Sequence, residues 1–340
     1  MRRQEIAVAD IGGTHARFAF AEIDSTGVLA LSEPVVLRTA DYPGLQGAWM
    51  EYARAAGRPL PNALAMAFAG PVAGEMLKLT NSDWVIQRAS LAEDLGVDRL
   101  VIVNDFGAVA HAVAGLGEGS FHTLCGPEEP LPDEGVISVI GPGTGLGVAQ
   151  LIRRADSYEV IETEGGHADF APLDETEDRI LQLLRGEYGR VSVERLLAGN
   201  GLDNVHWALA ILAGRPAKHH DDDRLLWARA LDGSDILAAA AVERFCLMLG
   251  AVAGDIALIQ GASAVVIGGG LGLKLADSLP RSGFCGRFIA KGRFKPRMAE
   301  IPVKLITYPQ PGLYGAAAAF ARSDNASAAA RPLAQAHWKL

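Results

Sequence analysis

Cysteine is scarce in this sequence. Its 340 residues include three cysteines, Cys125, Cys246 and Cys285. Their number is odd and no two have the Cys-x-x-Cys spacing, which excludes a disulfide framework and a zinc knuckle built from them. So little cysteine is typical of a reducing compartment, and we therefore expect a cytoplasmic protein.

A block of positive charge is also absent. The chain has 31 basic and 40 acidic residues, a net charge of −9. Nucleic acids and anionic membranes attract basic surfaces, so we expect neither as a partner. The uncharged stretch 256–273 contains five glycines. These predict the end of a helix, a turn, a buried strand at 264–267 and a glycine loop, in place of a membrane span.

Two glycine-rich turns are the most informative feature that the sequence contains. Gly12-Gly13-Thr14 follows the apolar run 6–11, and Gly143-Thr144-Gly145 follows the apolar run 137–142. Glycines let several backbone N–H groups converge on one phosphate. Either turn alone is an ordinary hairpin connection. Two such turns predict two half-sites for one nucleotide, and the nearby Asp10 suits Mg²⁺.

The better-known phosphate loops are missing. No Gly-Lys dipeptide occurs, so there is no P-loop. A dinucleotide-binding fingerprint would need a third glycine where Leu146 stands, with a helix after it. The segments after the two turns, 16–21 and 147–152, have the pattern of strands.

The order of elements predicts an α/β protein made of two related units. Each glycine turn belongs to an N-terminal hairpin. In the first half we expect helices near 45–56 and 90–95 and strands at 63–68 and 100–103, a pattern typical of a mixed or parallel sheet covered by helices. The second half continues into a mainly helical region, from about 174 to 261.

Asn104 and Asp105 end the strand at 100–103. Ligands gather at the carboxyl ends of strands in open α/β sheets, so Asp105 is a candidate catalytic residue. Capping of the following helix, 106–114, accounts for the same two residues equally well.

Three later segments are also rich in polar residues. Glu164 and His167 flank a Gly-Gly turn and could bind several hydroxyls; a metal site and a plain surface turn are the alternatives. Glu194 lies in the first turn of a short helix predicted at 192–199, where the helix dipole alone would explain it. Segment 217–224 contains two histidines and three aspartates. We expect it to be a solvated loop, and not a metal cluster.

Together these segments resemble the bacterial glucokinase family, within the hexokinase–actin–Hsp70 superfamily. The resemblance covers about residues 6–320, and no zinc-binding cysteine cluster follows His167, which indicates the zinc-free branch. The matching motifs are Asp10-Ile-Gly-Gly-Thr-His-Ala-Arg17, Thr80-Asn-Ser-Asp-Trp84, Asn104-Asp-Phe106, Gly141–Gly147, Glu164–Ala171, Glu194–Gly199, Gly268-Gly-Gly270, Lys291-Gly-Arg-Phe294 and Pro311-Gly-Leu-Tyr-Gly315.

The resemblance implies a two-domain actin-like ATPase (ribonuclease H-like) fold. Its mixed sheets would be flanked by helices, with the active site in the interdomain cleft. Residues 1–112 with 312–340 would form the small α/β domain, and residues 113–311 the large one, with a helical insertion. A homodimer is also implied.

The implied activity is ATP-dependent phosphorylation of D-glucose at its 6-hydroxyl, with Asp105 as general base. Asp10 would hold Mg²⁺, directly or through water. The other implied contacts are Asn104, Asp105, Glu164, His167 and Glu194 with the sugar, Gly12, Gly13, Thr14, Gly143, Thr144 and Gly145 with the phosphates, and Gly268, Gly269 and Gly270 beside the adenosine.

Three other functions are alternatives. A kinase for mannose, fructose or an amino sugar would share all the motifs. A sugar-sensing repressor would carry a DNA-binding segment before Asp10, where nine residues stand, and the negative charge argues against it. A non-catalytic, nucleotide-binding scaffold would have no need to retain both Asp10 and Asp105.

Overall fold

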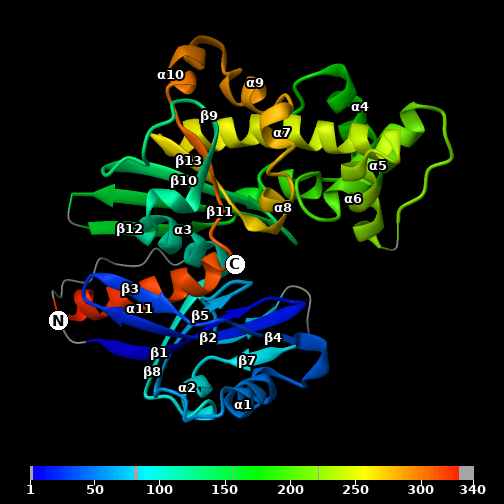
Figure 1. Cartoon of the computed structure of the whole chain (residues 1–340). Helices are drawn as coiled ribbons and strands as arrows, with labels where there is room; N and C mark the ends of the chain where they lie inside the picture. Colours follow the sequence, from blue (N-terminus) through cyan, green and yellow to red (C-terminus); the bar gives the residue numbers. More distant parts are fainter. Residues whose placement is uncertain (1–2, 80–82, 156, 221, 329–340) are drawn as a thin grey trace. The chain divides into compact units, whose positions relative to one another are not determined.

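The computed structural model describes residues 3–79, 83–155, 157–220 and 222–328. Their contacts divide the chain into two compact units, shown in Figure 1. Unit 1 consists of Met1–Leu116 together with Tyr308–Leu340, and unit 2 is Gly117–Thr307. Each unit is built on one large sheet flanked by helices.

Unit 1 contains a sheet in the order β3-β2-β1-β5-β8, with β4 beside β2. β1 pairs antiparallel with β2 and parallel with β5, which is parallel to β8. The elements of this unit are β1 (Gln4–Ile11), β2 (His15–Asp24), β3 (Gly27–Leu31), β4 (Val35–Arg38), η1 (Thr39–Asp41), α1 (Leu45–Ala56), β5 (Ala63–Phe68), β6 (Met76–Lys78), β7 (Val85–Gln87), α2 (Leu91–Asp94), β8 (Arg99–Asn104), α3 (Asp105–Gly115) and α11 (Pro311–Ala328).

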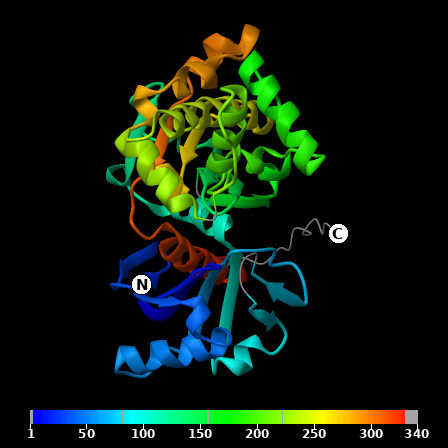
Figure 2. The same cartoon turned by 90° about the vertical axis from the view of Figure 1, so that its right-hand side faces the viewer.

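Both faces of the first sheet are buried, as parallel strands covered by helices require. Along β1, Ala7 and Ile11 pack on the side of α1, whereas Ile6 and Val8 pack on the side of α3 and α11. Figure 2 shows α1 and α11 on opposite faces of this sheet. All six residues of β5, the strand beside β1, are buried.

Helices α3 and α11 approach each other closely at Gly315. A Cβ at this position would lie 1.7 Å from the backbone oxygen of Ala108. Only glycine therefore permits this packing, which places the N-terminal part of α11 against α3. The helix is thus fixed to this unit although 195 residues separate α3 from it in the chain.

Unit 2 contains a second six-stranded sheet in the order β12-β11-β10-β13-β14-β9. β10 pairs antiparallel with β11 and parallel with β13. The elements of this unit are η2 (Glu118–Ser120), β9 (Phe121–Cys125), β10 (Gly135–Pro142), β11 (Leu146–Arg154), β12 (Ser157–Thr163), η3 (Gly165–His167), α4 (Glu175–Tyr188), η4 (Val193–Arg195), α5 (Gly201–Leu212), α6 (Asp223–Asp232), α7 (Ile236–Gln260), β13 (Ala264–Ile267), α8 (Gly269–Lys274), η5 (Leu279–Arg281), α9 (Phe284–Ile289), η6 (Gly292–Phe294), α10 (Lys295–Ala299) and β14 (Val303–Ile306).

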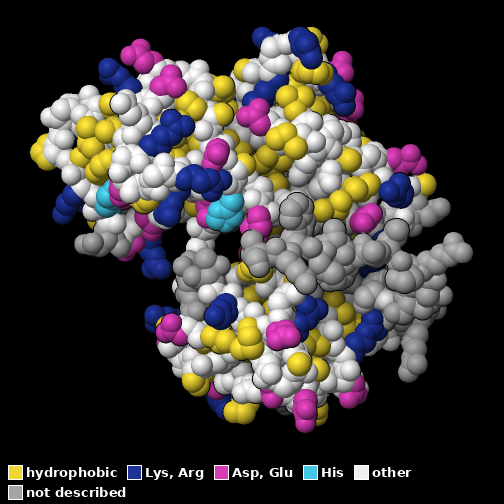
Figure 3. All heavy atoms as spheres, turned by 180° about the vertical axis from the view of Figure 1, so that it is seen from behind, with side chains coloured by type: hydrophobic (Ala, Val, Ile, Leu, Met, Phe, Trp, Pro, Cys, Tyr) yellow, Lys and Arg dark blue, Asp and Glu magenta, His cyan; other side chains and the backbone are white. Residues whose placement is uncertain are grey.

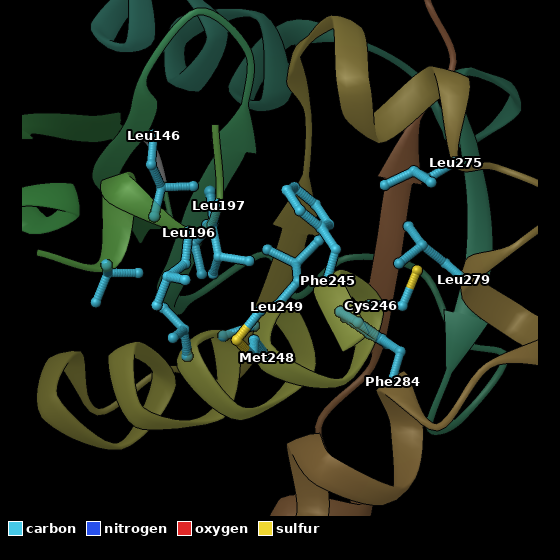
Figure 4. Close-up of a cluster of buried hydrophobic side chains, with 14 of the residues drawn as sticks. Leu146, Leu196, Leu197, Phe245, Cys246, Met248, Leu249, Leu275, Leu279 and Phe284 are labelled. Carbon is cyan, nitrogen blue, oxygen red and sulfur yellow. The ribbon is translucent and has the colours of Figure 1, made fainter. Parts of the chain in front are cut away.

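Helix α7 forms the centre of the core of unit 2. Phe245, Met248 and Leu249 of α7 pack in one cluster with residues from the sheet and from the other helices, part of which Figure 4 shows. Among the described helices, α7 is the one whose length and composition would allow it to cross a membrane. Most of its residues are buried inside unit 2, which makes it the core helix of this unit.

The structure confirms the mixed α/β architecture and most of the predicted elements. Helix 45–56 and strand 63–68 have the predicted bounds, and the predicted strand 100–103 lies within β8. The uncharged stretch 256–273 is the end of α7, a turn, β13 and a glycine segment, as predicted. One detail of that stretch was wrong: Gly269 and Gly270 begin the short helix α8, and do not belong to an open loop.

Candidate active site

The first glycine turn, Gly12–Thr14, connects β1 to β2 and is held by Thr39. Gly12 N donates to His15 O (3.0 Å), which closes the turn. The buried Thr39 donates twice, from Oγ1 to Gly13 O (2.6 Å) and from its N–H to Thr14 O (3.1 Å). None of these bonds uses the N–H of Gly13 or Thr14. The turn is therefore fixed in shape without consuming two donors that could bind a phosphate.

Asp10 lies at the end of β1 with its side chain largely buried. Arg17 faces it across the hairpin, with Nη1 3.4 Å from Oδ2. Burial raises the pKa of Asp10, and the charge of Arg17 partly offsets this effect. A Cβ at Gly312 would lie 2.9 Å from the carboxyl carbon of Asp10, so the first turn of α11 closely approaches the carboxylate. The positive end of that helix favours a negative charge there.

Asn104 and Asp105 stand where β8 ends and α3 begins. Asn104 caps the helix: its Oδ1 accepts from Phe106 N (2.9 Å) and Gly107 N (3.3 Å), and its Nδ2 donates to Gly70 O (3.2 Å). Asp105 Oδ1 also accepts from Phe106 N (2.9 Å). Asn104 is therefore the N-cap, and Asp105 follows it as the first residue of α3 at the carboxyl end of a strand.

The second glycine turn, Gly143–Gly145, connects β10 to β11. Gly143 N donates to Gly145 O (2.8 Å), and Gly143 O accepts from Gly199 N (2.8 Å). The third glycine segment packs against the same place, because Gly268 N donates to Ile140 O (2.8 Å). Gly269 has a φ of +75°, and a Cβ there would lie 2.5 Å from Pro142 O. Two glycine segments are thus neighbours at the end of β10.

Glu164, His167 and Glu194 lie together beside the second turn. His167 Nε2 is 3.9 Å from Glu164 Oε2 and 3.9 Å from Glu194 Oε1. Glu194 Oε2 accepts from Leu146 N (2.8 Å). The side chains of Glu164 and His167 are 72% and 57% exposed, against 31% for Glu194. Two carboxylates and an imidazole that remain accessible can bind several hydroxyl groups of one ligand.

Glycines place Glu164 and His167 against β11. A Cβ at Gly166 would lie 2.2 Å from Leu146 O, so the short helix η3 packs directly on the strand. Arg190 holds the far side of the segment, since its Nη2 donates to His167 O and its Nε lies 2.6 Å from Asp169 Oδ1. This segment is therefore braced from two directions.

The surroundings of Glu194 differ from the prediction. The predicted helix 192–199 is the 3₁₀ turn η4, and the Ser192 side chain makes no capping bond. The side chains of Leu196 and Leu197 are fully buried in the core of unit 2, and the burial of each stabilises the fold by about 1.5–3 kcal/mol. Figure 4 shows both leucines in one cluster with Leu146. Glu194 therefore bonds to the backbone of the glycine hairpin, and a helix dipole does not explain its position.

Comparison with known proteins identifies the family. The family model for glucokinase matches residues 7–323. The chain belongs to the glucokinase family. It is 58% identical to a glucokinase from Zymomonas mobilis, over 93% of this chain and 98% of that one, and 43% identical to a glucokinase from Paramagnetospirillum magneticum, over 95% and 99%. A crystal structure of a glucokinase from an Antarctic psychrotroph superimposes with a TM-score of 0.79 at 33% identity, covering 93% of this chain and 98% of that one.

Sequence reasoning did not assign a role to three residues that contact the first glycine turn, the His167 segment or Asp10. Thr39 and Arg190 lie 26 and 23 residues from their hydrogen-bond partners Gly13 and His167, and no local pattern marks them. Gly312 belongs to the motif Pro311–Gly315, but its closeness to Asp10 is visible only in the fold. Of the motif Thr80–Trp84, residues 80–82 lie outside the described residues.

Proposed function

We propose that this member of the glucokinase family phosphorylates D-glucose at the 6-hydroxyl, with ATP as donor, to give glucose 6-phosphate. The observation that carries the proposal is the 58% identity to a glucokinase along nearly the whole of both chains. The clustering of Glu164, His167 and Glu194 from separate segments supports it, because a sugar presents several hydroxyls that such a cluster can bind.

Asp105 is the proposed general base. A sugar hydroxyl becomes a good nucleophile when a carboxylate takes its proton during attack on the γ-phosphorus. Asp105 has the position this role needs, at the carboxyl end of β8, where ligands gather in α/β sheets. Because Asn104 provides the main helix cap, capping alone does not account for Asp105.

The proposed sugar contacts are Asn104, Asp105, Glu164, His167 and Glu194. Polar groups that a bound sugar covers discriminate strongly between epimers, because the wrong sugar leaves donors or acceptors without partners. Glu194 Oε1 and His167 face each other at 3.9 Å, which leaves room for a hydroxyl to bond to both after small shifts. The preference for glucose over other hexoses rests on this set.

The proposed nucleotide contacts are the three glycine segments. Gly12, Gly13 and Thr14, with Gly143, Thr144 and Gly145, would bind the phosphates, and Gly268, Gly269 and Gly270 would lie beside the adenosine. The two glycine segments of unit 2, 143–145 and 268–270, support this assignment, since both pack at the end of β10. Catalysis by such contacts rests on positioning and charge neutralisation around the phosphoryl group.

Asp10 is the proposed residue for Mg²⁺, which would neutralise phosphate charge when bound. The chemistry of the site fits a hard cation, because a carboxylate supplies the oxygen ligands that Mg²⁺ prefers. Burial raises the pKa of Asp10, and Arg17 partly offsets that rise. A cation that approaches Asp10, directly or through water, would favour the ionised carboxylate.

We propose that the binding partners are the small molecules glucose and ATP. We also propose that the protein is a homodimer and that it is located in the cytoplasm. Neither nucleic acid nor membrane is a proposed partner. Figure 3 shows acidic and basic side chains interspersed over the visible surface, which supports this view together with the net charge of −9. An extended basic face would favour a polyanion.

The test is ADP release from Mg-ATP over a panel of glucose, mannose, fructose and N-acetylglucosamine. We expect glucose to be far the best acceptor, and Asp105→Asn to lower kcat by about 10²–10⁴-fold. Asp98→Asn, an exposed carboxylate of the same unit, is the matched control and should keep full activity. Polyphosphate in place of ATP tests the donor.

Each result has a distinct meaning. Preference for another hexose would contradict the sugar contacts and leave the base in place. Unchanged turnover in Asp105→Asn would remove Asp105 from the role of base. No sugar-stimulated turnover would overturn the kinase proposal as a whole.

A further inference from the structure

Two histidines in the connection between α5 and α6 turn inward onto a buried carboxylate. The predicted solvated loop 217–224 is wrong at its end, where Asp223 and Arg224 belong to α6, and its histidines are not simply solvated. His219 Nδ1 lies 2.5 Å from Asp203 Oδ2, and His220 Nδ1 lies 2.6 Å from Asp203 Oδ1. The backbone N of His220 also donates to Asp203 Oδ1 (3.1 Å). Asp203 belongs to the first turn of α5, and its side chain is 10% exposed.

His206 completes a group of potential metal ligands. It follows Asp203 by three residues, so both side chains project from the same face of α5. Its ring lies 5.1 Å from that of His220, centroid to centroid. Nδ1 of His206 is buried and has no hydrogen-bond partner among the described residues. A buried polar atom left without a partner is uncommon in native proteins and calls for an explanation.

We propose that Asp203, His206 and His220 bind one zinc-like divalent cation. One ligand atom from each residue can be chosen so that all three lie within 4.8 Å of one another, so modest side-chain shifts would bring them around one ion. Two imidazole nitrogens and a carboxylate oxygen favour Zn²⁺ or Co²⁺ over Mg²⁺ and Ca²⁺, which prefer oxygen ligands alone. Such a site has three protein ligands and a position for water.

His219 would position the Asp203 ligand without binding the ion itself. Its ring stacks on Trp207 at 5.1 Å, and its nitrogens contact Asp203 and, at 3.2 Å, Glu187 Oε2. Residues that orient a metal ligand through a hydrogen bond are common around zinc sites. Here His219 would orient the Asp203 carboxylate and link the site to α4, which carries Glu187.

The consequence of binding would be structural. Asp203 and His206 belong to α5, whereas His220 lies eight residues beyond the end of that helix. An ion bound by all three would tie the connection to the helix and restrict its local opening. The site is independent of the glucokinase reaction, since none of its residues belongs to the proposed sugar or nucleotide contacts.

The primary test measures zinc binding by calorimetry. Tag-free protein, stripped with EDTA and returned to chelator-free buffer, is titrated with ZnCl₂. We expect one Zn²⁺ per chain, with affinity at least about 100-fold weaker in His206→Asn and His220→Asn. His219→Asn should weaken binding by about 10–100-fold, as loss of a supporting residue does. The exposed His122→Asn, on β9, should bind like the wild type.

A second measurement separates this site from the cysteines. Cys125 and Cys285 interact with each other and could themselves hold zinc. The double variant Cys125→Ser/Cys285→Ser should keep full zinc affinity. Co²⁺ bound to the wild type should show the visible bands of nitrogen and oxygen ligation without a thiolate charge-transfer band. This spectrum needs no variant, and so it stays informative if His206→Asn does not fold.

A third measurement reports on the connection itself. Zn²⁺ should slow proteolysis within residues 213–222 in the wild type and in His122→Asn, but not in His220→Asn. Absence of stoichiometric binding in the wild type would overturn the proposal. Unaltered affinity in both histidine variants, or loss of affinity in the cysteine variant, would overturn it as well.

Discussion

The two units share the arrangement of five strands but differ in the sixth, which is β4 beside β2 in unit 1 and β9 beside β14 in unit 2, and they differ in chemistry. The order β3-β2-β1-β5-β8 in unit 1 corresponds strand by strand to β12-β11-β10-β13-β14 in unit 2. Among the five matched strands, β2 and β3 follow β1 as antiparallel neighbours, just as β11 and β12 follow β10, whereas β5 and β8 are parallel to β1, just as β13 and β14 are parallel to β10. β1 and β10 are therefore the first strands of the two matched sets, and β2 and β11 the second. In both, a glycine turn connects the first strand to the second.

The acidic residues stand at different places in the two sheets. In unit 1, Asp10 lies near the end of β1, and Asp105 is the first residue of α3, directly after β8. In unit 2, β10 and β14 end in Pro142 and Ile306, and the acids are Glu164, after β12, and Glu194, in η4. The comparison shows that a repeated scaffold preserves the glycine turns, while the remaining groups are placed independently.

The glycine turns are also supported differently. Thr39, which holds the first turn, uses a hydroxyl and a backbone N–H. The second turn is held by Gly199 and by Glu194, whose carboxylate is a proposed sugar contact. We therefore expect damage to the first turn to affect ATP alone, and damage to the second to affect glucose as well.

Asp10 has no acidic counterpart in unit 2, and among the variants that test this difference we expect Asp10→Asn to reduce activity most. It should lower kcat by about 10²–10³-fold, the usual effect of removing one preorganised electrostatic group. It should also raise Tm near neutral pH, because burial raises the pKa of Asp10 and so makes the charged form costly to fold. The raised pKa means that this cost disappears as the pH falls below the ordinary pKa of 3.8.

The measurement is a series of thermal unfolding curves from pH 7 to about pH 4 for both proteins in EDTA. The gain in Tm should shrink as the pH falls. An equal Tm at pH 7 would show that Arg17 and the end of α11 fully compensate the buried charge.

Glu194→Ala should have the next largest effect. It removes an acceptor and leaves Leu146 N without its partner, a loss of about 1–3 kcal/mol. We expect KM for glucose to rise by about 10–100-fold. Glu194→Gln keeps an acceptor for Leu146 N and should retain the hairpin, so it isolates the contribution of the charge. Equal KM values in wild type and Glu194→Ala would contradict the proposed sugar contact.

Gly145→Ala and Gly143→Ala form a matched pair within one turn. A Cβ at Gly145 would lie 2.5 Å from Glu194 Oε2, whereas one at Gly143 would meet nothing closer than 4.0 Å. We expect Gly145→Ala to displace the carboxylate and raise KM for glucose about tenfold, the equivalent of 1.4 kcal/mol. Gly143→Ala should change this constant little. Steady-state kinetics with both substrates varied decides the point, and similar effects from the two variants would contradict the close contact with Glu194.

Thr39→Val should have the smallest effect. It removes the hydroxyl that bonds to Gly13 O, worth about 0.5–1.5 kcal/mol, and keeps the backbone bond to Thr14. We expect KM for ATP to rise a few-fold with KM for glucose unchanged. Thr39→Ser, which keeps the hydroxyl, is the control. A rise in KM for glucose would contradict the expectation that damage to the first turn affects ATP alone.

Local patterns predicted the scaffold well. Neighbouring residues determine the structure of the strand 63–68, of the amphipathic helix 45–56 and of the glycine turns, so local patterns are sufficient to predict them. The same reasoning correctly noted that Asn104 and Asp105 could cap a helix, and the structure assigns the main cap to Asn104.

Contacts between distant segments were beyond the reach of these patterns. The expected helix 192–199 does not form because Leu196 and Leu197 are drawn into a core that residues far along the chain complete. The inward turn of His219 and His220 depends on Asp203, 16 and 17 residues away. Tertiary packing overrides local preference in such segments.

Helix α11 has a consequence for how the chain is made. Ile6 and Ala65 lie in one hydrophobic cluster with Leu313 and Phe320, although about 200 residues separate this helix from the rest of unit 1 in the sequence. At about 5–20 residues per second of synthesis, one face of the first sheet stays uncovered for roughly 10–40 s after its strands have been made. Unit 2 is contiguous and has no such delay. A chain arrested at Thr307 would therefore contain every residue of unit 2, but the surroundings of Asp10 would still lack Gly312.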